Sequence, residues 1–363
     1  MVRGQADFAS RPTIRDVAER AGVAPSTASL VFSGRGPVAD ATAQRVRAAA
    51  SELGYAGPDP RAASLRSGRA GAVGVLVEGR LLQAFRDPYA VIVLDGLAQE
   101  LDAIPTGMLL VAQPFDEPER AMEVVTGLAI DAFVFSMCGP AETPVVDHLA
   151  TRGIPMLGTG APSDDRVHQV LIDEAGAQGE IVHHLRDLGH RRIGHVTMPM
   201  RPVTPGGKLR PADLERAEYV DSRERARGFL ATAGRRSPMV EAATADVEGG
   251  IAAARVLLDR SADTRPTAVA AQSDLLAAGV IQVAGELGLR VPDDLSVTGF
   301  DGVSLPWLAT PLTTIDQHGE QKGRALGRLV ARLIGGDGGG EVENVTIPTD
   351  LRVGGTTGPP PRP

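Results

Sequence analysis

The sequence lacks the features that mark exported or membrane-bound proteins. It has one cysteine, Cys138, and residues 1–7 lack the apolar core of a signal peptide. No later segment approaches the length and apolarity of a membrane span. Lysine is also scarce, since Lys208 and Lys322 are the only two, and we attribute the preference for arginine to coding composition rather than to a site. The missing signal peptide and membrane span predict a cytoplasmic location.

Complete motifs for catalysis, cofactor binding and metal binding are missing as well. Residues 158–163 nearly match a dinucleotide-binding loop, but the third glycine is absent and Pro162 stands where a helix should begin. Residues 202–209 do not form a phosphate loop, because the first glycine and a hydroxyl residue after Lys208 are absent. No cysteine or acid completes a metal-ligand set with the four clustered histidines, His183, His184, His190 and His195. No Gly-x-Ser-x-Gly elbow occurs. We therefore predict no cofactor, no metal and no catalytic residue, and the sequence argues against an enzyme.

The net charge of -8 over 363 residues is unevenly distributed along the chain. Residues 1–70 hold ten arginines against six acids, a net charge of +4, while the remaining 27 basic and 39 acidic residues give -12. Phosphate neutralisation is local, so a basic head on an acidic body suits DNA that is bound at one end of the molecule. The overall negative charge therefore does not exclude a nucleic-acid partner.

Residues 13–32 are predicted to form two short helices separated by a tight turn. Apolar residues recur at helical spacing in the first helix, namely Ile14, Val17, Ala18 and Ala21. Thr13 can cap this helix, Gly22 supplies the turn, and Pro25 suits the first turn of the second helix. Such a helix-turn-helix fits the major groove of double-stranded DNA. This stretch is the strongest functional signal in the chain.

A third helix and a linker follow. Residues 39–53 carry apolar positions at helical spacing and end at Gly54, which completes a small three-helix headpiece over residues 1–56. The Gly/Pro-rich residues 56–60 indicate a linker, and the helix-capable run 61–66 follows it. We assign residues 57–70 to a linker and hinge helix.

From Ala72 onward, apolar runs of strand length alternate with amphipathic helices. The predicted strands are 72–77, 108–111, 132–135, 154–158, 192–196, 267–271 and 296–300. Continuous apolar strands between helices are typical of parallel sheets covered on both faces, and the length fits two such lobes. Because ligands bind at the carboxyl ends of such strands, we predict a binding site in the cleft between the lobes.

The predicted core spans residues 71–353 and serves effector binding and dimerisation. Its first lobe comprises about 71–171 and 317–335, and its second lobe about 172–314 and 341–353. The Gly/Pro-rich residues 354–363 are predicted to be a disordered tail.

Separate motifs along nearly the whole chain resemble the LacI/GalR family of bacterial transcription regulators. They include residues 13–18, 52–55, 62–65, 87–89, 184–193, 225–229, 266–269 and 291–301. The resemblance implies a helix-turn-helix headpiece followed by an α/β core like that of periplasmic binding proteins, with two doubly wound parallel-sheet lobes. A solute-binding protein of the same two-lobed fold is the alternative, but the helical pair and the missing signal peptide oppose it.

By this resemblance, Pro25, Ser26 and Leu30 of the second helix face the floor of the major groove. Ser26 can hydrogen-bond a base edge, whereas Leu30 offers only apolar contact, for example to a thymine methyl, or simply packs within the headpiece. The hydroxyls of Thr27, Ser29, Ser33 and Thr42 are suited to phosphate oxygens, and Thr13 is also assigned to DNA binding.

The resemblance also implies that residues 61–66 form a hinge helix on operator DNA. Arg61, Ala62 and Leu65 are its expected DNA-contacting residues, with Leu65 wedged into a minor-groove step. Packing of Leu65 between domains is the alternative. Two departures concern this segment: Ala63 stands where the family often has arginine, and one residue is inserted between Tyr55 and Pro58.

For the effector cleft, the resemblance selects Arg225, Ser273 and Asp301 as residues that hold a small ligand by its hydroxyls or carboxylate. The first-lobe wall is assigned to Glu78, Phe85, Pro88 and Tyr89, and Gly160 occupies a position where aspartate is frequent. Asp301 as a strand-end cap and Arg225 in a helix-surface ion pair remain alternatives. Gln317 lies near a crossover between lobes, so a hinge role competes with ligand contact.

We therefore predict a ligand-responsive, sequence-specific DNA-binding regulator, a repressor released from its operator by a small sugar-like effector or related polar metabolite. Its expected partners are a pseudo-palindromic double-stranded operator and a second copy of the chain in a homodimer, with a tetramer left open. The sequence does not choose between inducer and corepressor, although the habits of the family favour an inducer. A cytoplasmic, nucleoid-associated protein is expected.

Overall fold

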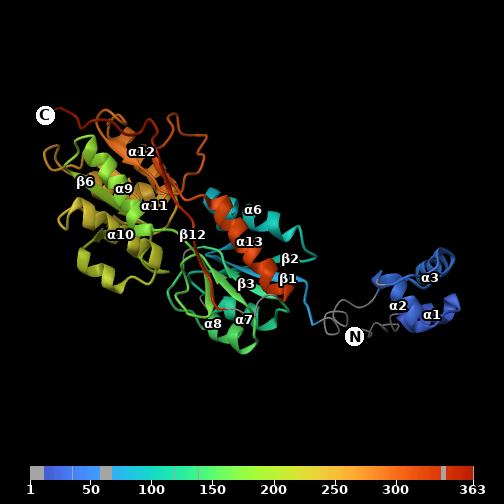
Figure 1. Cartoon of the computed structure of the whole chain (residues 1–363). Helices are drawn as coiled ribbons and strands as arrows, with labels where there is room; N and C mark the ends of the chain where they lie inside the picture. Colours follow the sequence, from blue (N-terminus) through green and yellow to red (C-terminus); the bar gives the residue numbers. More distant parts are fainter. Residues whose placement is uncertain are drawn as a thin grey trace, which may run out of the picture. The chain divides into compact units, whose positions relative to one another are not determined.

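The computed structural model describes residues 12–34, 36–57, 68–117, 119–137, 139–336 and 341–362. The chain divides into two compact units, Met1–Ala70 and Gly71–Pro363 (Figure 1). The expected hinge contacts Arg61, Ala62 and Leu65 lie outside the described residues, as does Cys138. No helix in the described part of the chain is long and apolar enough to cross a membrane.

The headpiece consists of three helices, α1 (Ile14–Ala21), α2 (Pro25–Ser33) and α3 (Asp40–Leu53). Thr13 caps α1 in a reciprocal capping box with Asp16, and Gly22 ends the helix in the left-handed conformation, at a φ of 63°. The helices enclose a small core of Val17, Ala18, Ala28, Val46, Ala49 and Ala50. The helices predicted from periodicity and capping are therefore confirmed.

The sheet of the first lobe has six parallel strands in the order β12-β5-β4-β3-β1-β2. Their bounds are β1 Ala72–Glu78, β2 Gly107–Gln113, β3 Ala132–Phe135, β4 Met156–Gly158, β5 Val167–Leu171 and β12 Asn344–Thr346. Side chains alternate between the faces of the sheet, so Val134 packs with the residues of one hydrophobic cluster and Phe133 with those of another. Both faces are thus buried, as the continuous apolar strands predict.

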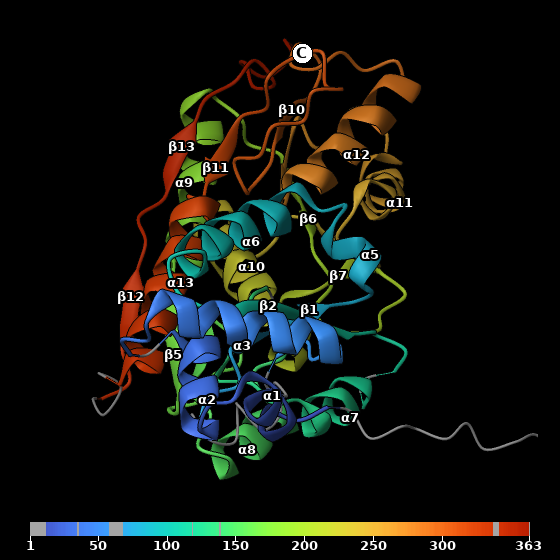
Figure 2. The same ribbon diagram turned by 90° about the vertical axis from the view of Figure 1, so that its right-hand side faces the viewer.

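Two pairs of helices cover this sheet. On one face lie α6 (Pro88–Leu101) and α13 (Gly319–Gly335), which run side by side (Figure 2). On the other face lie α7 (Arg120–Gly127) and α8 (Pro144–Thr151), and the short α5 (Leu81–Ala84) follows β1. Gly96 and Gly323 let α6 and α13 approach closely, because a side chain at either position would collide with the facing backbone.

The second lobe repeats this design with a five-stranded sheet in the order β10-β9-β6-β8-β7. Its strands are β6 Ile193–Thr197, β7 Gly207–Leu209, β8 Met239–Glu241, β9 Ala268–Ala271 and β10 Ser296–Thr298. All pairings are parallel except that of β7 with β8. Helices α9 (Glu174–Asp187) and α10 (Val220–Ala233) cover one face, whereas α11 (Val247–Leu258) and α12 (Asp274–Glu286) cover the other. A 3₁₀ turn, η1 (Pro211–Arg216), precedes α10.

Residues 341–353 do not all belong to the second lobe, so that part of the predicted lobe boundary is wrong. Strand β12 pairs with β5 in the sheet of the first lobe, and only β13 (Asp350–Arg352) reaches the second lobe region, where it pairs with β11 (Thr314–Asp316) (Figure 2). Each of these strands has three residues, too few for a hydrophobic period that would indicate the partner sheet.

The predicted disordered tail is also wrong for residues 354–362, which the structure describes. Thr356 is buried, and it exchanges two hydrogen bonds with Val297 of β10, as the acceptor at 2.9 Å and the donor at 2.7 Å. The carbonyl oxygen of Gly358 lies 2.8 Å from His190 Nε2. Strand β10 is at the edge of its sheet, and the tail occupies hydrogen-bonding groups that this edge would otherwise leave open.

Candidate functional site

Helix α2 presents the candidate DNA-reading surface of the headpiece. Pro25, Ser26 and Leu30 are exposed, and Leu30 retains 37% of its accessible surface. Leu30 is absent from the cluster that forms the headpiece core, so the alternative that it serves only as a packing residue is not favoured. The exposed hydroxyl of Ser26 and the exposed apolar side chain of Leu30 thus lie on a helix of the right size for the major groove.

Three of the residues assigned to phosphate contacts, Thr27, Ser29 and Ser33, belong to α2 itself, and Thr42 lies on α3. Ser33 is exposed, whereas Thr27, Ser29 and Thr42 are partly buried. The hydroxyl of Thr13 is used in capping, since it donates to Asp16 at 2.8 Å and the Thr13 amide donates to the same carboxylate at 2.6 Å. These bonds lower the pKa of Asp16, the bond from the backbone of Thr13 most strongly.

Three exposed arginines of the headpiece, Arg15, Arg45 and Arg47, form no ion pair within the described residues. Exposed guanidinium groups without a counterion are suited to DNA phosphates, which bind arginine with charge-assisted hydrogen bonds.

A cavity of about 370 Å³ lies between the two lobes of the core. It is lined by the carboxyl ends of strands and by helix starts from both lobes, as expected for paired doubly wound sheets. The polar side chains of its lining are Glu78, Gln83, Arg86, Asp87, Tyr89, Tyr219, Ser222, Arg225, Thr244, Asp246, Ser273, Asp301 and Gln317. This volume falls within the range of pockets that bury a small ligand.

Five of the residues assigned to the effector site line this cavity: Glu78, Tyr89, Arg225, Ser273 and Asp301. The other three do not. Phe85 ends α5 with 63% of its surface exposed, and Pro88 fills the first turn of α6. Gly160 follows β4, where its amide donates to Gln169 Oε1 at 2.9 Å. The lining of the cleft therefore does not include Phe85, Pro88 or Gly160.

Glu78 and Tyr219 join the lobes across the cleft. Glu78 ends β1 of the first lobe, and Tyr219 precedes α10 of the second. The Tyr219 hydroxyl donates to Glu78 Oε1 at 2.6 Å. Burial raises the pKa of Glu78 to about 8, although the bond from Tyr219 opposes the shift. The amide of Ala141 adds a backbone bond of 3.1 Å to Glu218 beside this contact.

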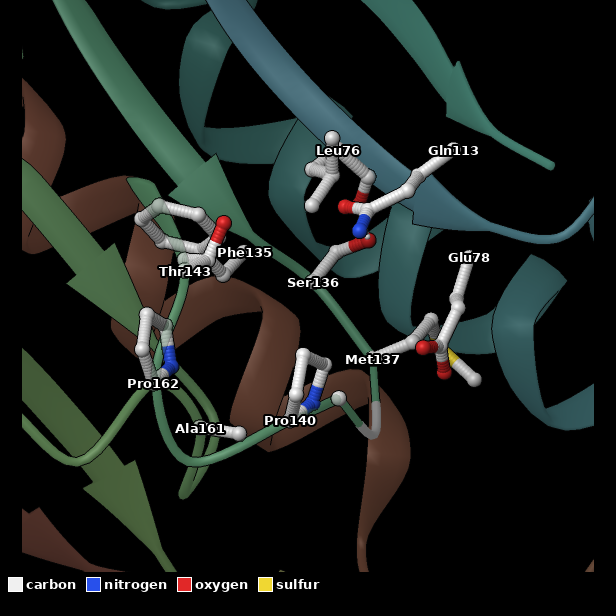
Figure 3. A pocket seen from close by; sticks show the side chains of 11 residues that line it. Leu76, Glu78, Gln113, Phe135, Ser136, Met137, Pro140, Thr143, Ala161 and Pro162 are labelled. Atoms are coloured by element: carbon white, nitrogen blue, oxygen red, sulfur yellow. Dashed lines mark hydrogen bonds between the residues drawn. The ribbon is translucent and has the colours of Figure 1, made fainter. Parts of the chain in front are cut away.

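A smaller cavity of about 20 Å³ adjoins this contact (Figure 3). Glu78 and Met137 line both the small cavity and the main cleft. Ser136 and Thr143 lie on its first-lobe wall, where the hydroxyl of Ser136 donates to the carbonyl oxygen of Leu76 at 2.9 Å. Its lining is mostly apolar, with Leu76, Phe135 and Pro162 among its residues, so the small cavity borders the cleft without extending its polar wall.

Arg225 lies on α10 and is only 3% exposed. Its Nε donates to Glu174 Oε2 at 2.6 Å, and one terminal nitrogen donates to the carbonyl oxygen of Gln272 at 2.7 Å. The guanidinium also stacks over the ring of Phe300, 3.8 Å from its centroid. The ion pair considered as an alternative for Arg225 therefore exists, but it is buried and fixes the guanidinium at the cleft.

Gln272 is itself fixed by a buried network. Its side chain donates to Ser222 O and lies 3.1 Å from His195 Nε2, and its Oε1 accepts from the Met198 amide. His195 stacks on Phe229, and burial lowers its pKa to about 3, which keeps the ring neutral. The neutral ring donates from Nδ1 to the carbonyl oxygen of Ala270, 2.7 Å away, and Nε2 accepts. His195, one of the four histidines clustered in the sequence, is therefore a structural residue that helps to hold Gln272, to whose carbonyl Arg225 donates.

Asp301 follows β10 with a φ of 135°, a conformation that is rare outside glycine. Its Oδ1 accepts from Gln317 Nε2 at 2.8 Å, and its Oδ2 accepts from the amide of Asp274 at 3.2 Å. Burial raises the pKa of Asp301 well above its ordinary value, and the carboxyl of Asp274 raises it further. Asp301 thus accepts a hydrogen bond from the first residue of α12, as a capping residue would, and its carboxyl also lines the cleft.

Gln317 connects both lobes at their crossover. Besides donating to Asp301, it accepts at Oε1 from the Tyr89 hydroxyl at 3.0 Å and from Lys322 Nζ at 3.2 Å. Tyr89 lies on α6 of the first lobe, whereas Asp301 belongs to the second. The hinge role and the cleft position proposed for Gln317 therefore coincide in one residue.

The sequence assignment missed several polar residues of the cleft: Gln83, Arg86, Asp87, Tyr219, Ser222, Thr244 and Asp246. Asp87 and Asp246 cap helices, and the helix-start pattern that revealed Thr13 also marks them. Ser222 is fully buried, and its hydroxyl has no hydrogen-bond partner within the described residues. Such a group is suited to a bound ligand, because leaving it unpaired is costly.

No group of three or more potential metal-ligating side chains occurs within the described part of the chain.

A helix-turn-helix headpiece, coupled in one chain to a two-lobed core with a polar cleft, defines a ligand-responsive DNA-binding transcriptional regulator. Two family models match the chain. Bacterial regulatory proteins of the lacI family match residues 13–57, and the periplasmic binding protein-like domain matches residues 182–357. The chain belongs to the LacI family of bacterial transcriptional regulators.

Full-length relatives support this assignment. An HTH-type transcriptional regulator of Mycolicibacterium smegmatis is 34% identical over 96% of this chain and 97% of its own length. The HTH-type transcriptional regulator IpsA of Corynebacterium glutamicum is 31% identical over 89% of this chain and 91% of its own. A solved structure of the CelR–cellobiose complex has a TM-score of 0.68 at 28% identity and covers 95% of this chain and all of that one. These relatives are transcriptional regulators, which disfavours the solute-binding alternative.

Proposed function

We propose that this protein is a repressor, and that a neutral, polyhydroxylated, sugar-like molecule bound in the interlobe cleft releases it from its operator. The observation that carries the proposal is the composition of the cleft wall. It offers a fixed guanidinium at Arg225, several carboxyl groups, and the hydroxyl of Ser222, which has no hydrogen-bond partner among the described residues. Sugar hydroxyls both donate and accept, so they can satisfy such a mixed set.

The charge of the wall favours a neutral sugar over an acidic one. Acidic side chains from both lobes surround the cavity, namely Glu78, Asp87, Asp246 and Asp301. Arg225 is already paired with Glu174, which leaves Arg86 as the other cationic group in the lining. Among the described residues, Arg86 is the one cation of this wall without a carboxylate partner, so a carboxylate or phosphate ligand would find little positive charge, whereas polyol hydroxyls can bond to the carboxyl groups in either protonation state. The cellobiose bound to the related CelR agrees with this chemistry.

The proposed assembly is a cytoplasmic, nucleoid-associated homodimer that binds a pseudo-palindromic operator, one headpiece to each half-site. Exposed apolar side chains of the core are available to such an interface. They occur on both lobes, at Leu81, Leu82, Val91, Leu109, Val256 and Leu287. Pro25, Ser26 and Leu30 would read bases, whereas Arg61, Ala62 and Leu65 would form the hinge contacts.

A thermal-shift screen tests the effector class. Neutral mono- and disaccharides are compared with the corresponding sugar acids at equal concentration, because a ligand that binds only the folded protein raises its midpoint. We expect at least one neutral sugar to raise the midpoint and its acid to fail. Stabilisation by the acids alone would contradict the proposed charge selectivity.

A further inference from the structure

A second hollow, with the opposite charge, lies at the other edge of the second-lobe sheet. It is an open depression of about 670 Å³ at the amino-terminal ends of β6, β8 and β9. The carboxyl ends of these strands lead instead into cleft residues such as Met198 and Ser273. The hollow is therefore separated from the effector cleft by the length of the sheet.

Five arginines line the hollow: Arg191, Arg192, Arg235, Arg236 and Arg260. They come from three separate loops, those that precede β6, β8 and β9. No carboxylate belongs to the lining, in which the remaining residues are apolar, small or hydroxyl-bearing. Convergence of three loops distinguishes this arrangement from a run of charge along one exposed segment.

None of these five arginines pairs with a carboxylate within the described residues. Arg192 donates to the carbonyl oxygens of Arg265 and Ala262, at 2.9 and 3.5 Å. Within the described chain, no hydrogen bond or ion pair engages the side chains of the other four, Arg191, Arg235, Arg236 and Arg260. Elsewhere in the core, arginines such as Arg166 and Arg290 pair with carboxylates.

Helix ends explain part of the cluster but not all of it. Helices α9, α10 and α11 end at this edge, and helix carboxyl ends attract cations. Arg186 fulfils that role by donating to the carbonyl oxygen of Ala233, and Arg265 does so at Leu258. Within the described residues, the side chains of Arg235 and Arg236 donate to no carbonyl oxygen, and no carboxylate pairs with them to offset the repulsion between their charges. The sequence beyond residue 70 has a net charge of -12, so the positive charge gathered in this hollow is opposite to that of the core as a whole.

We propose that this hollow is a second ligand site, which binds a small molecule with a chain of two or more phosphate groups. Guanidinium groups bind phosphate oxygens with paired, charge-assisted hydrogen bonds. Several guanidiniums in one depression suit several linked phosphates, and the volume fits a metabolite of nucleotide size. The site differs from the cleft in both charge and position, so a phosphorylated signal would act independently of the sugar-like effector.

Titration calorimetry of the full-length protein with inorganic tripolyphosphate, at about 150 mM salt, tests the proposal. The headpiece also attracts phosphate, so variants must separate the two contributions. The double variant Arg235→Ser/Arg236→Ser removes two exposed, unpaired charges of the hollow. The control Arg201→Ser/Arg216→Ser removes two charges from exposed arginines of the same lobe that lie outside the hollow and form no ion pair in the described structure. Arg260→Gln probes a second loop independently.

We expect tripolyphosphate to bind the wild type, the double variant to weaken binding at least tenfold, and Arg260→Gln to weaken it several-fold. The control is expected to stay within twofold of the wild type. No binding to the wild type, or equal weakening by the double variant and the control, would overturn the proposal. Tighter binding of hexaglutamate than of tripolyphosphate, with the same dependence on Arg235 and Arg236, would also overturn it by assigning the hollow to an acidic protein segment.

Discussion

Tyr219 and Glu78 form a hydrogen bond of 2.6 Å between residues 141 positions apart, and this bond joins the second lobe to the first. It lies in the wall of the cleft, next to the cavity in Figure 3. Tyr219 also stands at the N-cap position of α10, the helix that carries Arg225. The relative position of the lobes and the position of the main cationic group are therefore set by the same short segment.

Glu78 makes stability depend on pH in a defined direction. Its pKa rises from an ordinary 4.5 to about 8 on folding, so the folded protein binds the proton more tightly than the unfolded chain does. This contribution to stability is present below about pH 4.5 and is lost as the pH rises through 8. Glu78→Gln is expected to lose this dependence, which has a slope of at most about 1.4 kcal/mol per pH unit. Urea unfolding of both proteins between pH 5 and 8 measures it.

The control for this experiment is Glu123→Gln, which neutralises an exposed glutamate on α7. It is expected to follow the wild-type pH profile. Parallel profiles for the wild type and Glu78→Gln would mean that the Glu78 carboxyl is not protonated at neutral pH.

Removal of the Tyr219 hydroxyl is expected to weaken effector binding without unfolding the protein. Tyr219→Phe keeps the buried ring but loses one bond between the lobes. A net contribution of about 1 kcal/mol corresponds to a loss of about fivefold in effector affinity. Titration calorimetry with a sugar identified in the thermal-shift screen measures the effector affinity of the wild type and of Tyr219→Phe. An unchanged affinity would show that the bond does not stabilise the liganded arrangement of the lobes.

Arg225 is expected to affect both the stability of the core and effector binding. Arg225→Ala leaves the partly buried Glu174 and the Gln272 carbonyl without their donor, so a loss of about 3 kcal/mol in the free energy of unfolding is expected. The effector response is expected to vanish while operator affinity remains. Arg223→Ala on the same helix is the control, because Arg223 pairs with Glu224 at a more exposed position. Equal loss of operator affinity and effector response in Arg225→Ala would contradict the assignment of Arg225 to the cleft.

In the headpiece, Leu30→Ala is expected to weaken specific operator binding about five- to tenfold and to leave nonspecific binding unchanged. Leu30 is exposed on α2, so its loss creates no cavity in the headpiece core. Apolar contact with a thymine methyl contributes only where that base is present. Fluorescence anisotropy with specific and scrambled duplexes distinguishes the two. A proportional loss on both duplexes would assign Leu30 to general packing.

Local patterns predicted much of the fold. The headpiece helices follow from apolar spacing and from caps at Thr13 and Gly22, which depend on neighbouring residues alone. The long apolar strands were predicted within a few residues of their ends. Strand β5 was missed because His168 and Gln169 interrupt its apolar run, and β12 was missed because three residues carry no period. The tail at Thr356 is ordered by an edge strand far away in sequence, which no local pattern reveals.

The site was predictable where it coincides with strand ends and helix starts. Ser273 and Asp301 follow β9 and β10 closely, so their place at the cleft follows from the topology. The assignment of Phe85 to the cleft wall is wrong because this residue follows the short α5 with its side chain exposed. Tyr219 could not be predicted to meet Glu78, since their contact depends on how the two lobes pack.

The central claim is that the occupied cleft controls the DNA-binding headpiece. The most direct test is the affinity for a genomic operator fragment retained by the protein, measured by fluorescence anisotropy with and without a saturating neutral sugar that binds the cleft. The account predicts that the sugar weakens operator binding at least fivefold, in line with allosteric coupling of about 1 kcal/mol or more. Unchanged operator affinity with the cleft saturated would contradict it.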